Sequence, residues 1–278
     1  MNVSQRTHST GYPIFTIQTG DSEFELSSFG GQLLSWNKSG QPILFANRDH
    51  AVVDGKTPYR GGAPICFPYF GKGLLLPGSP LLATQHGHAR TTIWSSEVRG
   101  SSITFRTRQP SPEGFGPTTL ECELTYHLAD NLQIEARVTN IGESESPFQL
   151  AVHSYWACAN PSTATVQGLS ERYLDNLDGY RESFESASDS PHMAPVDRVY
   201  PDASNDLELQ TDAYRLWIKT AGCAGTVLWN PGPHHTIADL GSPDFVCVES
   251  GMISPARVLA AGSRHLVTIS YAVEVFKK

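Results

Sequence analysis

The sequence predicts an all-β protein, built as a large antiparallel β-sandwich with few short helices. Short stretches in which apolar and polar residues alternate recur along the chain, with turn-forming residues between them. This is the pattern of half-buried strands. Glycine and proline contribute 24 and 19 of the 278 residues, so many turns are expected. We find no sustained 3.6-residue apolar periodicity, which argues against long helices.

The alternating segments place the strands along the chain. Residues 1–10 are polar and are expected to form a loose lead-in, whereas residues 160–200 are expected to form a long irregular connection of the kind that often carries function. Turn residues at 19–22 and 129–131 predict hairpins. The segments expected to be strands are 12–18, 23–28, 32–36, 42–46, 102–108, 119–128, 131–140, 148–158, 214–220, 225–229, 245–249 and 266–276. No linker or repeat divides the chain, so a single domain, 1–278, is expected.

Composition excludes several classes of function. The net charge of −8 weighs against a nucleic-acid partner, which usually requires a basic face. No apolar run approaches the ~18 residues of a membrane span, so no membrane partner is expected. The five cysteines are scattered without a CxxC pair, and the first residues lack the apolar core of a secretory signal. These features indicate reduced thiols in a cytoplasmic protein.

Residues 59–71, with the sequence YRGGAPICFPYFG, form the most unusual stretch. Glycines allow a ligand to approach the backbone, and prolines end regular strand pairing. The stretch therefore predicts a shaped loop with an aromatic lining and one guanidinium, that of Arg60. A purely structural corner remains the alternative at this point.

A second cluster, at 85–90, has the sequence QHGHAR. Its two imidazoles, His86 and His88, suggest a metal site, but no third ligand or carboxylate follows at short range. The alternatives are a surface of hydrogen-bond donors for a polar ligand, which would include Gln85 and Arg90, and a solvated loop.

Two titratable residues lie on apolar segments. His153 is near the middle of the predicted strand 148–158, where a histidine is often a satisfied core residue. Glu249 follows the apolar run 245–248, so its carboxylate is either exposed at the edge of a sheet or buried because it has a functional role. The strand pattern alone does not choose between these interpretations.

Taken together and in this order, the clusters resemble the hexose-6-phosphate mutarotases, or glucose-6-phosphate 1-epimerases, within the aldose 1-epimerase (galactose mutarotase-like) group. The matching stretches are 60–71, 85–90, 153–156, 196–200, 229–231 and 246–249. The resemblance implies the galactose mutarotase-like β-sandwich with an open sugar cleft. It also implies an isomerase that needs no cofactor or metal, acts on a small sugar phosphate and is a monomer.

The resemblance also implies roles for single residues. His153 and Glu249 match the catalytic pair, and Arg60, Gln85, Arg90 and Asp197 match sugar contacts. His86 matches a histidine with which non-phosphorylated relatives contact the sugar.

In the expected chemistry, Glu249 removes the proton of the C1 hydroxyl and His153 protonates the ring oxygen. The ring opens, the C1–C2 bond turns and the ring closes on the other face. Histidine titrates near neutral pH, and burial could raise the pKa of the glutamate toward that range. The planar guanidinium groups of Arg60 and Arg90 are suited to phosphate oxygens.

The sequence also departs from the family pattern. His88, Ser154 and Trp156 replace commoner residues. After 229–231 the family usually has a tryptophan and a lysine, whereas Gly232, His234 and His235 stand here. The missing lysine removes a possible anion contact.

Three alternative functions remain open, and the missing lysine favours the first of them. They are a mutarotase of free aldoses, a non-catalytic carbohydrate-binding sandwich, and a metal-dependent enzyme that uses His86 and His88 with His234 or His235.

Overall fold

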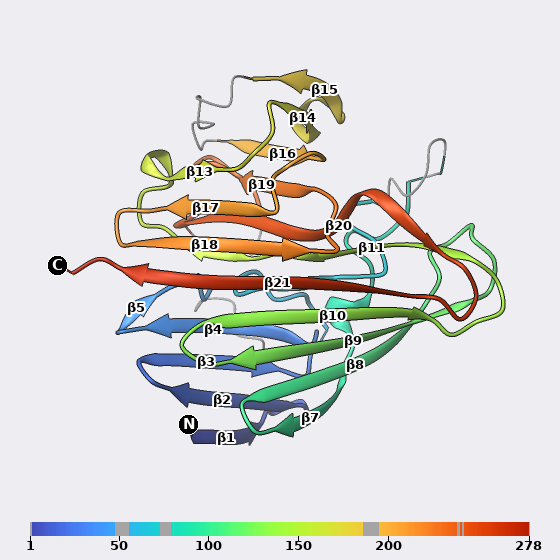
Figure 1. The fold of residues 1–278 in the computed structure, drawn as a ribbon, viewed down its shortest axis with the longest axis horizontal. Helices are drawn as coiled ribbons and strands as arrows, with labels where there is room; N and C mark the ends of the chain where they lie inside the picture. Colours follow the sequence, from blue (N-terminus) through green and yellow to red (C-terminus); the bar gives the residue numbers. More distant parts are fainter. Residues whose placement is uncertain are drawn as a thin grey trace.

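The computed structural model describes residues 2–47, 56–72, 79, 81–185, 195–237, 240 and 242–277. In these residues the chain forms three antiparallel sheets and three single-turn 3-10 helices (Figure 1). The helices are η1 (Ala89–Thr91), η2 (Pro161–Thr163) and η3 (Asn176–Asp178). No helix among the described residues is long enough to cross a membrane. The predicted all-β class is confirmed.

The first sheet contains the N-terminal strands and has the order β1-β2-β3-β4-β5. Its strands are β1 (Asn2–Thr7), β2 (Pro13–Thr19), β3 (Ser22–Ser27), β4 (Gln32–Lys38) and β5 (Gln41–Pro42).

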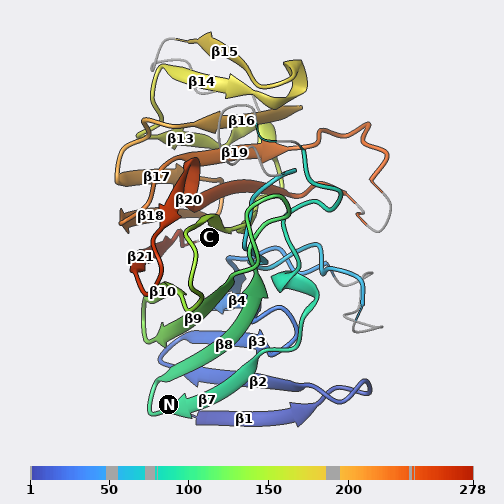
Figure 2. The ribbon, with the colours of Figure 1, turned by 90° about the vertical axis from the view of Figure 1, so that its right-hand side faces the viewer.

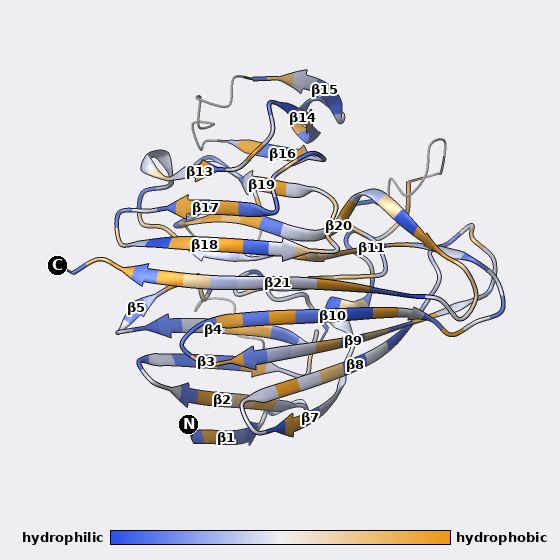
Figure 3. Cartoon of the chain, in the orientation of Figure 1, coloured by the Kyte–Doolittle hydropathy of each residue, from blue (hydrophilic) through white to orange (hydrophobic). Residues whose placement is uncertain are grey.

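The second sheet has the order β13-β17-β18-β21-β10-β9-β8-β7 and forms one whole layer (Figures 1 and 2). Its strands are β7 (Ser95–Arg99), β8 (Ser102–Pro110), β9 (Thr119–Leu128), β10 (Leu132–Asn140), β13 (Thr165–Gln167), β17 (Asp206–Gln210), β18 (Tyr214–Ala221) and β21 (Arg264–Val275). Every second residue of β9 is buried, which follows from its TLECELTYHL sequence. Figure 3 shows the corresponding change of hydropathy from residue to residue along the strands.

The third sheet has the order β15-β14-β16-β19-β20-β11-β6, and β12 pairs with β20 beside this path. Its strands are β6 (Ile65–Cys66), β11 (Ser146–Val152), β12 (Tyr155–Ala157), β14 (Arg172–Asp175), β15 (Arg181–Phe184), β16 (Val196–Tyr200), β19 (Thr226–Asn230) and β20 (Phe245–Leu259).

One hydrophobic core joins the three sheets, because the second sheet packs against both of the others. Phe15 of β2 meets Phe105 of β8 edge to face, with ring centroids 6.1 Å apart. Trp156 of β12 lies 5.0 Å from Tyr271 of β21, again between ring centroids. The third sheet buries more apolar residues on its opposite face, among them Val199, Val227 and Ile253. That face, turned away from the common core, carries the site described below.

Four local expectations were wrong. Residues 2–7 form β1 instead of a loose lead-in; its side chains are almost all exposed, so it lacks the apolar alternation of a half-buried strand. The connection 160–200 contains β13, β14, β15 and β16, and residues 186–194 lie outside the described residues. The expected strand 42–46 is reduced to β5, and 148–158 is divided into β11 and β12.

Candidate active site

His153 lies at the break between β11 and β12, not within a continuous strand. Its backbone N–H donates to the carbonyl of Pro64 at 2.9 Å, and the N–H of Tyr155 donates to that of Gly62 at 2.8 Å. Just beyond Pro64, β6 pairs with the end of β11. The 59–71 loop therefore contributes an edge strand and fixes the backbone on both sides of His153.

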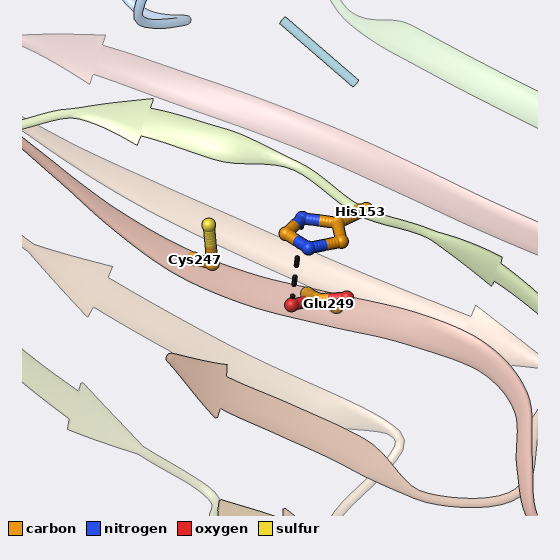
Figure 4. Close-up of side chains that lie close together, drawn as sticks. All are labelled: His153, Cys247 and Glu249. Carbon is orange, nitrogen blue, oxygen red and sulfur yellow. Dashed lines mark ion pairs between the residues drawn. The ribbon is translucent and has the colours of Figure 1, made fainter. Parts of the chain in front are cut away.

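The position of Glu249 follows from the pairing of β20 with β11, in which Val152 is opposite Ser250. The two side chains meet on the outer face of the third sheet, with 3.5 Å between His153 Nδ1 and Glu249 Oε1 (Figure 4). Glu249 is 1% exposed and His153 is 8% exposed. Neither His153 Nδ1 nor Glu249 Oε2 has a hydrogen-bond partner. Because buried polar atoms are normally satisfied, these two atoms are available to a ligand.

Burial pushes both members of the pair toward their neutral forms. It lowers the pKa of His153 to about 3, and the positive charges of Arg90 and Arg60 act in the same direction. It raises the pKa of Glu249 well above the ordinary value, and the nearby Asp197 adds to this effect. Although the distance would permit an ion pair, desolvation makes a neutral imidazole beside a protonated carboxyl the favoured state of the free site.

The tautomer of His86 is fixed by its surroundings. Its Nδ1 accepts the backbone N–H of Gly71 at 3.2 Å, and burial lowers its pKa, so the neutral ring carries its proton on Nε2. The ring lies edge to face with Phe70 and with His153, at centroid distances of 4.9 and 5.4 Å. His86 is therefore a preset hydrogen-bond donor next to the pair.

The backbone around His86 leaves little space for other residues. His86 and Gly87 have φ values of 65° and 68°. A Cβ at Gly87 would lie 2.2 Å from the carbonyl oxygen of Phe67. Likewise, a Cβ at Gly62 would lie 2.2 Å from the carbonyl oxygen of Leu33. These contacts explain why the two loops beside the site need glycine at these positions.

Arg60 and Arg90 are half-buried, and neither forms an ion pair with a carboxylate of the described residues. Arg90 Nη2 donates to the backbone carbonyl of Gln85 at 2.7 Å, while the Gln85 side chain is exposed. Burial lowers the pKa of Arg90, and Arg60 adds to this effect. Two neighbouring guanidinium groups without a counterion form a potential anion site.

Asp197 lies on β16, in a row that crosses four strands. The paired residues of this row are Asp197, Trp229, Cys247 and Tyr155. Asp197 accepts a 2.6 Å hydrogen bond from Asn176 of η3, and burial raises its pKa to about 6. Glu249 is two residues beyond Cys247 and so faces the same side of the sheet.

Aromatic rings surround His153. Tyr155 stacks on it at 4.8 Å with an interplanar angle of 12°, and Trp229 meets it edge to face at 5.6 Å. The sequence patterns indicated no role for Tyr155, Trp229, Asn176 or Cys247. The two-residue spacing from His153 to Tyr155 and from Cys247 to Glu249 was the available signal, because alternate strand residues share a face.

The structure does not gather the four histidines of the metal-dependent alternative. His86 is buried, whereas His88 and His234 are exposed. Among the described residues, the three-donor group that could hold a metal ion consists of His153, Cys247 and Glu249.

A cavity of about 1010 Å³ lies elsewhere, between the first sheet and the C-terminal residues. Its lining includes Arg6, Glu25, Tyr59 and Asp212 but none of the seven predicted site residues. The buried pair, and not the size of a cavity, therefore locates the candidate active site.

Comparison with known proteins agrees with this architecture. Residues 13–272 match the family model described as aldose 1-epimerase. An Escherichia coli K12 protein, provisionally named a glucose-6-phosphate 1-epimerase, is 26% identical in an alignment of 241 positions that covers 82% of this chain and 79% of that protein. A Cenchrus ciliaris protein with the same provisional name is 27% identical in an alignment of 262 positions that covers 86% of this chain and 77% of that protein.

Solved structures have the same fold. A Salmonella typhimurium structure, described provisionally as a mutarotase, superposes with a TM-score of 0.79 at 21% identity and covers 99% of this chain and 94% of its own. Galactose 1-epimerase from Lactobacillus acidophilus NCFM gives a TM-score of 0.73 at 14% identity, with 99% of both chains covered. With the family model matching most of its length, this chain belongs to the aldose 1-epimerase family.

Proposed function

We propose that this protein interconverts the α and β anomers of a hexose 6-phosphate, with glucose 6-phosphate as its main substrate. Family membership makes it an isomerase of sugars. The observation that supports the chemistry best is the buried His153–Glu249 pair, whose facing atoms, Nδ1 and Oε1, are 3.5 Å apart. Two atoms of the pair, His153 Nδ1 and Glu249 Oε2, have no hydrogen-bond partner.

In the proposed mechanism Glu249 takes the proton of the C1 hydroxyl and His153 gives a proton to the ring oxygen. The pair carries one proton both as neutral groups and as carboxylate and imidazolium. The reactive state therefore requires a proton to move from Glu249 to His153, with no exchange with solvent. Ring opening returns the pair to its neutral form, which burial favours. The open-chain intermediate is therefore formed beside a neutral imidazole and a protonated carboxyl.

The phosphate assignment is supported by Arg60 and Arg90, whose half-buried guanidinium groups pair with no carboxylate in the part of the chain that the structure describes. It agrees with the provisional names of the curated relatives. A bound phosphate dianion would also offset the two positive charges that lower the pKa of His153. That pKa would then rise, and the imidazolium acid would become easier to form.

The remaining site residues would hold the sugar ring. Asp197 offers a carboxylate, His86 offers its Nε2–H, and Gln85 offers an exposed amide at the rim. Trp229 and Tyr155 would provide apolar surface beside the pair. We assign no part in the reaction to His88, His234 or His235.

The test is exchange spectroscopy by NMR on the purified protein, with a panel of hexoses and hexose 6-phosphates. We expect α–β exchange of glucose 6-phosphate with a higher kcat/KM than that of glucose. Equal values would refute the phosphate assignment and favour a mutarotase of free aldoses. Binding without any accelerated exchange would refute the isomerase and favour a carbohydrate-binding protein.

A further inference from the structure

Cys247 completes a group of three ligand atoms with the proposed catalytic pair. It is two residues before Glu249 on β20, so both side chains are on the same face of the strand, and His153 faces them from the end of β11 (Figure 4). One donor atom from each residue lies within 4.8 Å of the other two, and all three residues are buried.

The spacing of the pair fits a bound metal. Two ligand atoms of a tetrahedral zinc ion are about 3.4 Å apart, because Zn–N and Zn–O bonds are ~2.0–2.2 Å. His153 Nδ1 and Glu249 Oε1 are 3.5 Å apart. A Zn–S bond of ~2.3 Å would require the thiolate about 3.6 Å from each of them. The three donor atoms already lie within 4.8 Å of one another, so Sγ would have to approach the pair by about 1.2 Å at most.

Two polar atoms of the pair also lack hydrogen-bond partners. These atoms are His153 Nδ1 and Glu249 Oε2. Both residues are more than nine-tenths buried, so water does not readily reach these atoms. A metal ion would satisfy the nitrogen lone pair and the carboxylate oxygen at once.

The chemistry of the donors selects the ion. One imidazole nitrogen, one sulfur and one carboxylate oxygen suit Zn²⁺, whereas Mg²⁺ and Ca²⁺ prefer oxygen ligands only. We propose that His153, Cys247 and Glu249 bind Zn²⁺ and that the bound ion inhibits the enzyme. The inhibition rests on the proposed function, because zinc would occupy the nitrogen and oxygen that exchange protons with the sugar. The binding itself rests on the three residues alone.

Binding is tested without any sugar. Metal-free protein is titrated with Zn²⁺ by calorimetry and with Cd²⁺ by ultraviolet absorption, since a thiolate–cadmium bond gives a charge-transfer band. We expect one ion per chain and the cadmium band in the native protein. Cys247→Ala should weaken Zn²⁺ binding at least ~10-fold, since loss of even an outer-shell partner costs 10–100-fold in metal affinity. Cys247→Val serves as a second variant that fills more of the space.

Cys122→Ala is the matched control, because Cys122 is an equally buried thiol on β9, away from the pair. It should bind Zn²⁺ like the native protein. Unchanged affinity in the folded Cys247 variants, or no cadmium band in the native protein, would overturn the site.

Inhibition is measured separately, as α–β exchange with added Zn²⁺ and then with a chelator. We expect Zn²⁺ to suppress exchange in the native protein, the chelator to restore it, and the Cys247 variants to resist suppression. Exchange that persists with the site filled would refute the inhibition. Zn²⁺ binding in a protein with no exchange activity would refute the proposed function and leave the metal site standing.

Discussion

Replacement of Arg90 by glutamine tests whether Arg60 and Arg90 hold the substrate's phosphate. The change removes the charge and the planar fork of donors but keeps a polar side chain. A hydrogen bond to a charged group contributes about 1.5–3 kcal/mol. Because 1.4 kcal/mol is a factor of ten, KM for glucose 6-phosphate should rise by ~10- to ~150-fold. The half-buried position of Arg90, which limits competition by water, favours the upper part of this range.

The assay is NMR exchange on glucose 6-phosphate and on glucose, with the same enzyme preparation. Free glucose has no phosphate to lose, so its KM should change less than threefold. Arg257→Gln is the matched control: Arg257 is on β20 and exposed, and it should leave both substrates unaffected. An equal loss on both substrates in Arg90→Gln would show that Arg90 supports the site as a whole, and the reasoning about phosphate would be wrong.

Two further predictions concern the backbone and the charge of the site. Gly87→Ala should lower the free energy of unfolding by more than Gly100→Ala in urea titrations. Both positions have positive φ, which costs ~1–2 kcal/mol, but only a Cβ at Gly87 meets another atom, the Phe67 oxygen at 2.2 Å. Equal decreases in the free energy of unfolding for the two variants would contradict the close approach of Gly87 to the Phe67 carbonyl. For Asp197→Asn, the free energy of unfolding, measured by thermal denaturation, should increase relative to that of the native protein as pH rises from about 4 to 7. The increase should be at most ~3 kcal/mol. The native carboxyl, with its pKa raised to about 6 by partial burial, must ionise over this range in a place that disfavours the charge. A pH-independent difference would refute this burial effect.

Sequence periodicity predicted the strands that bury one face, because burial imposes alternation. The segments 119–128 and 131–140 became β9 and β10 almost residue for residue. It could not predict β1, whose residues are nearly all exposed and which is held by backbone pairing with β2. Nor could it predict the strands β14 and β15 in the expected loop 160–200, because these short segments lack a regular apolar pattern.

Some residues of the candidate site were also predictable from the sequence, and others were not. Resemblance in short motifs predicted His153 and Glu249, which the structure brings together from strands almost a hundred residues apart. It did not indicate Cys247, because a buried cysteine among apolar residues has the pattern of an ordinary core residue. The contact of Asn176 with Asp197 depends on how η3 approaches β16, which is a tertiary arrangement that no local pattern encodes.

The central proposal is that Glu249 and His153 exchange protons with the sugar, and Glu249→Gln tests it most directly. The substitution keeps the shape of the buried side chain and removes its acid–base function. Exchange of glucose 6-phosphate anomers, followed by NMR, should slow by ~10²–10⁴-fold, and His153→Gln should have a similar effect. Glu123→Gln, a change in a surface ion pair, should have no effect on the rate. Near-native exchange in a folded Glu249→Gln protein would contradict the proposed mechanism.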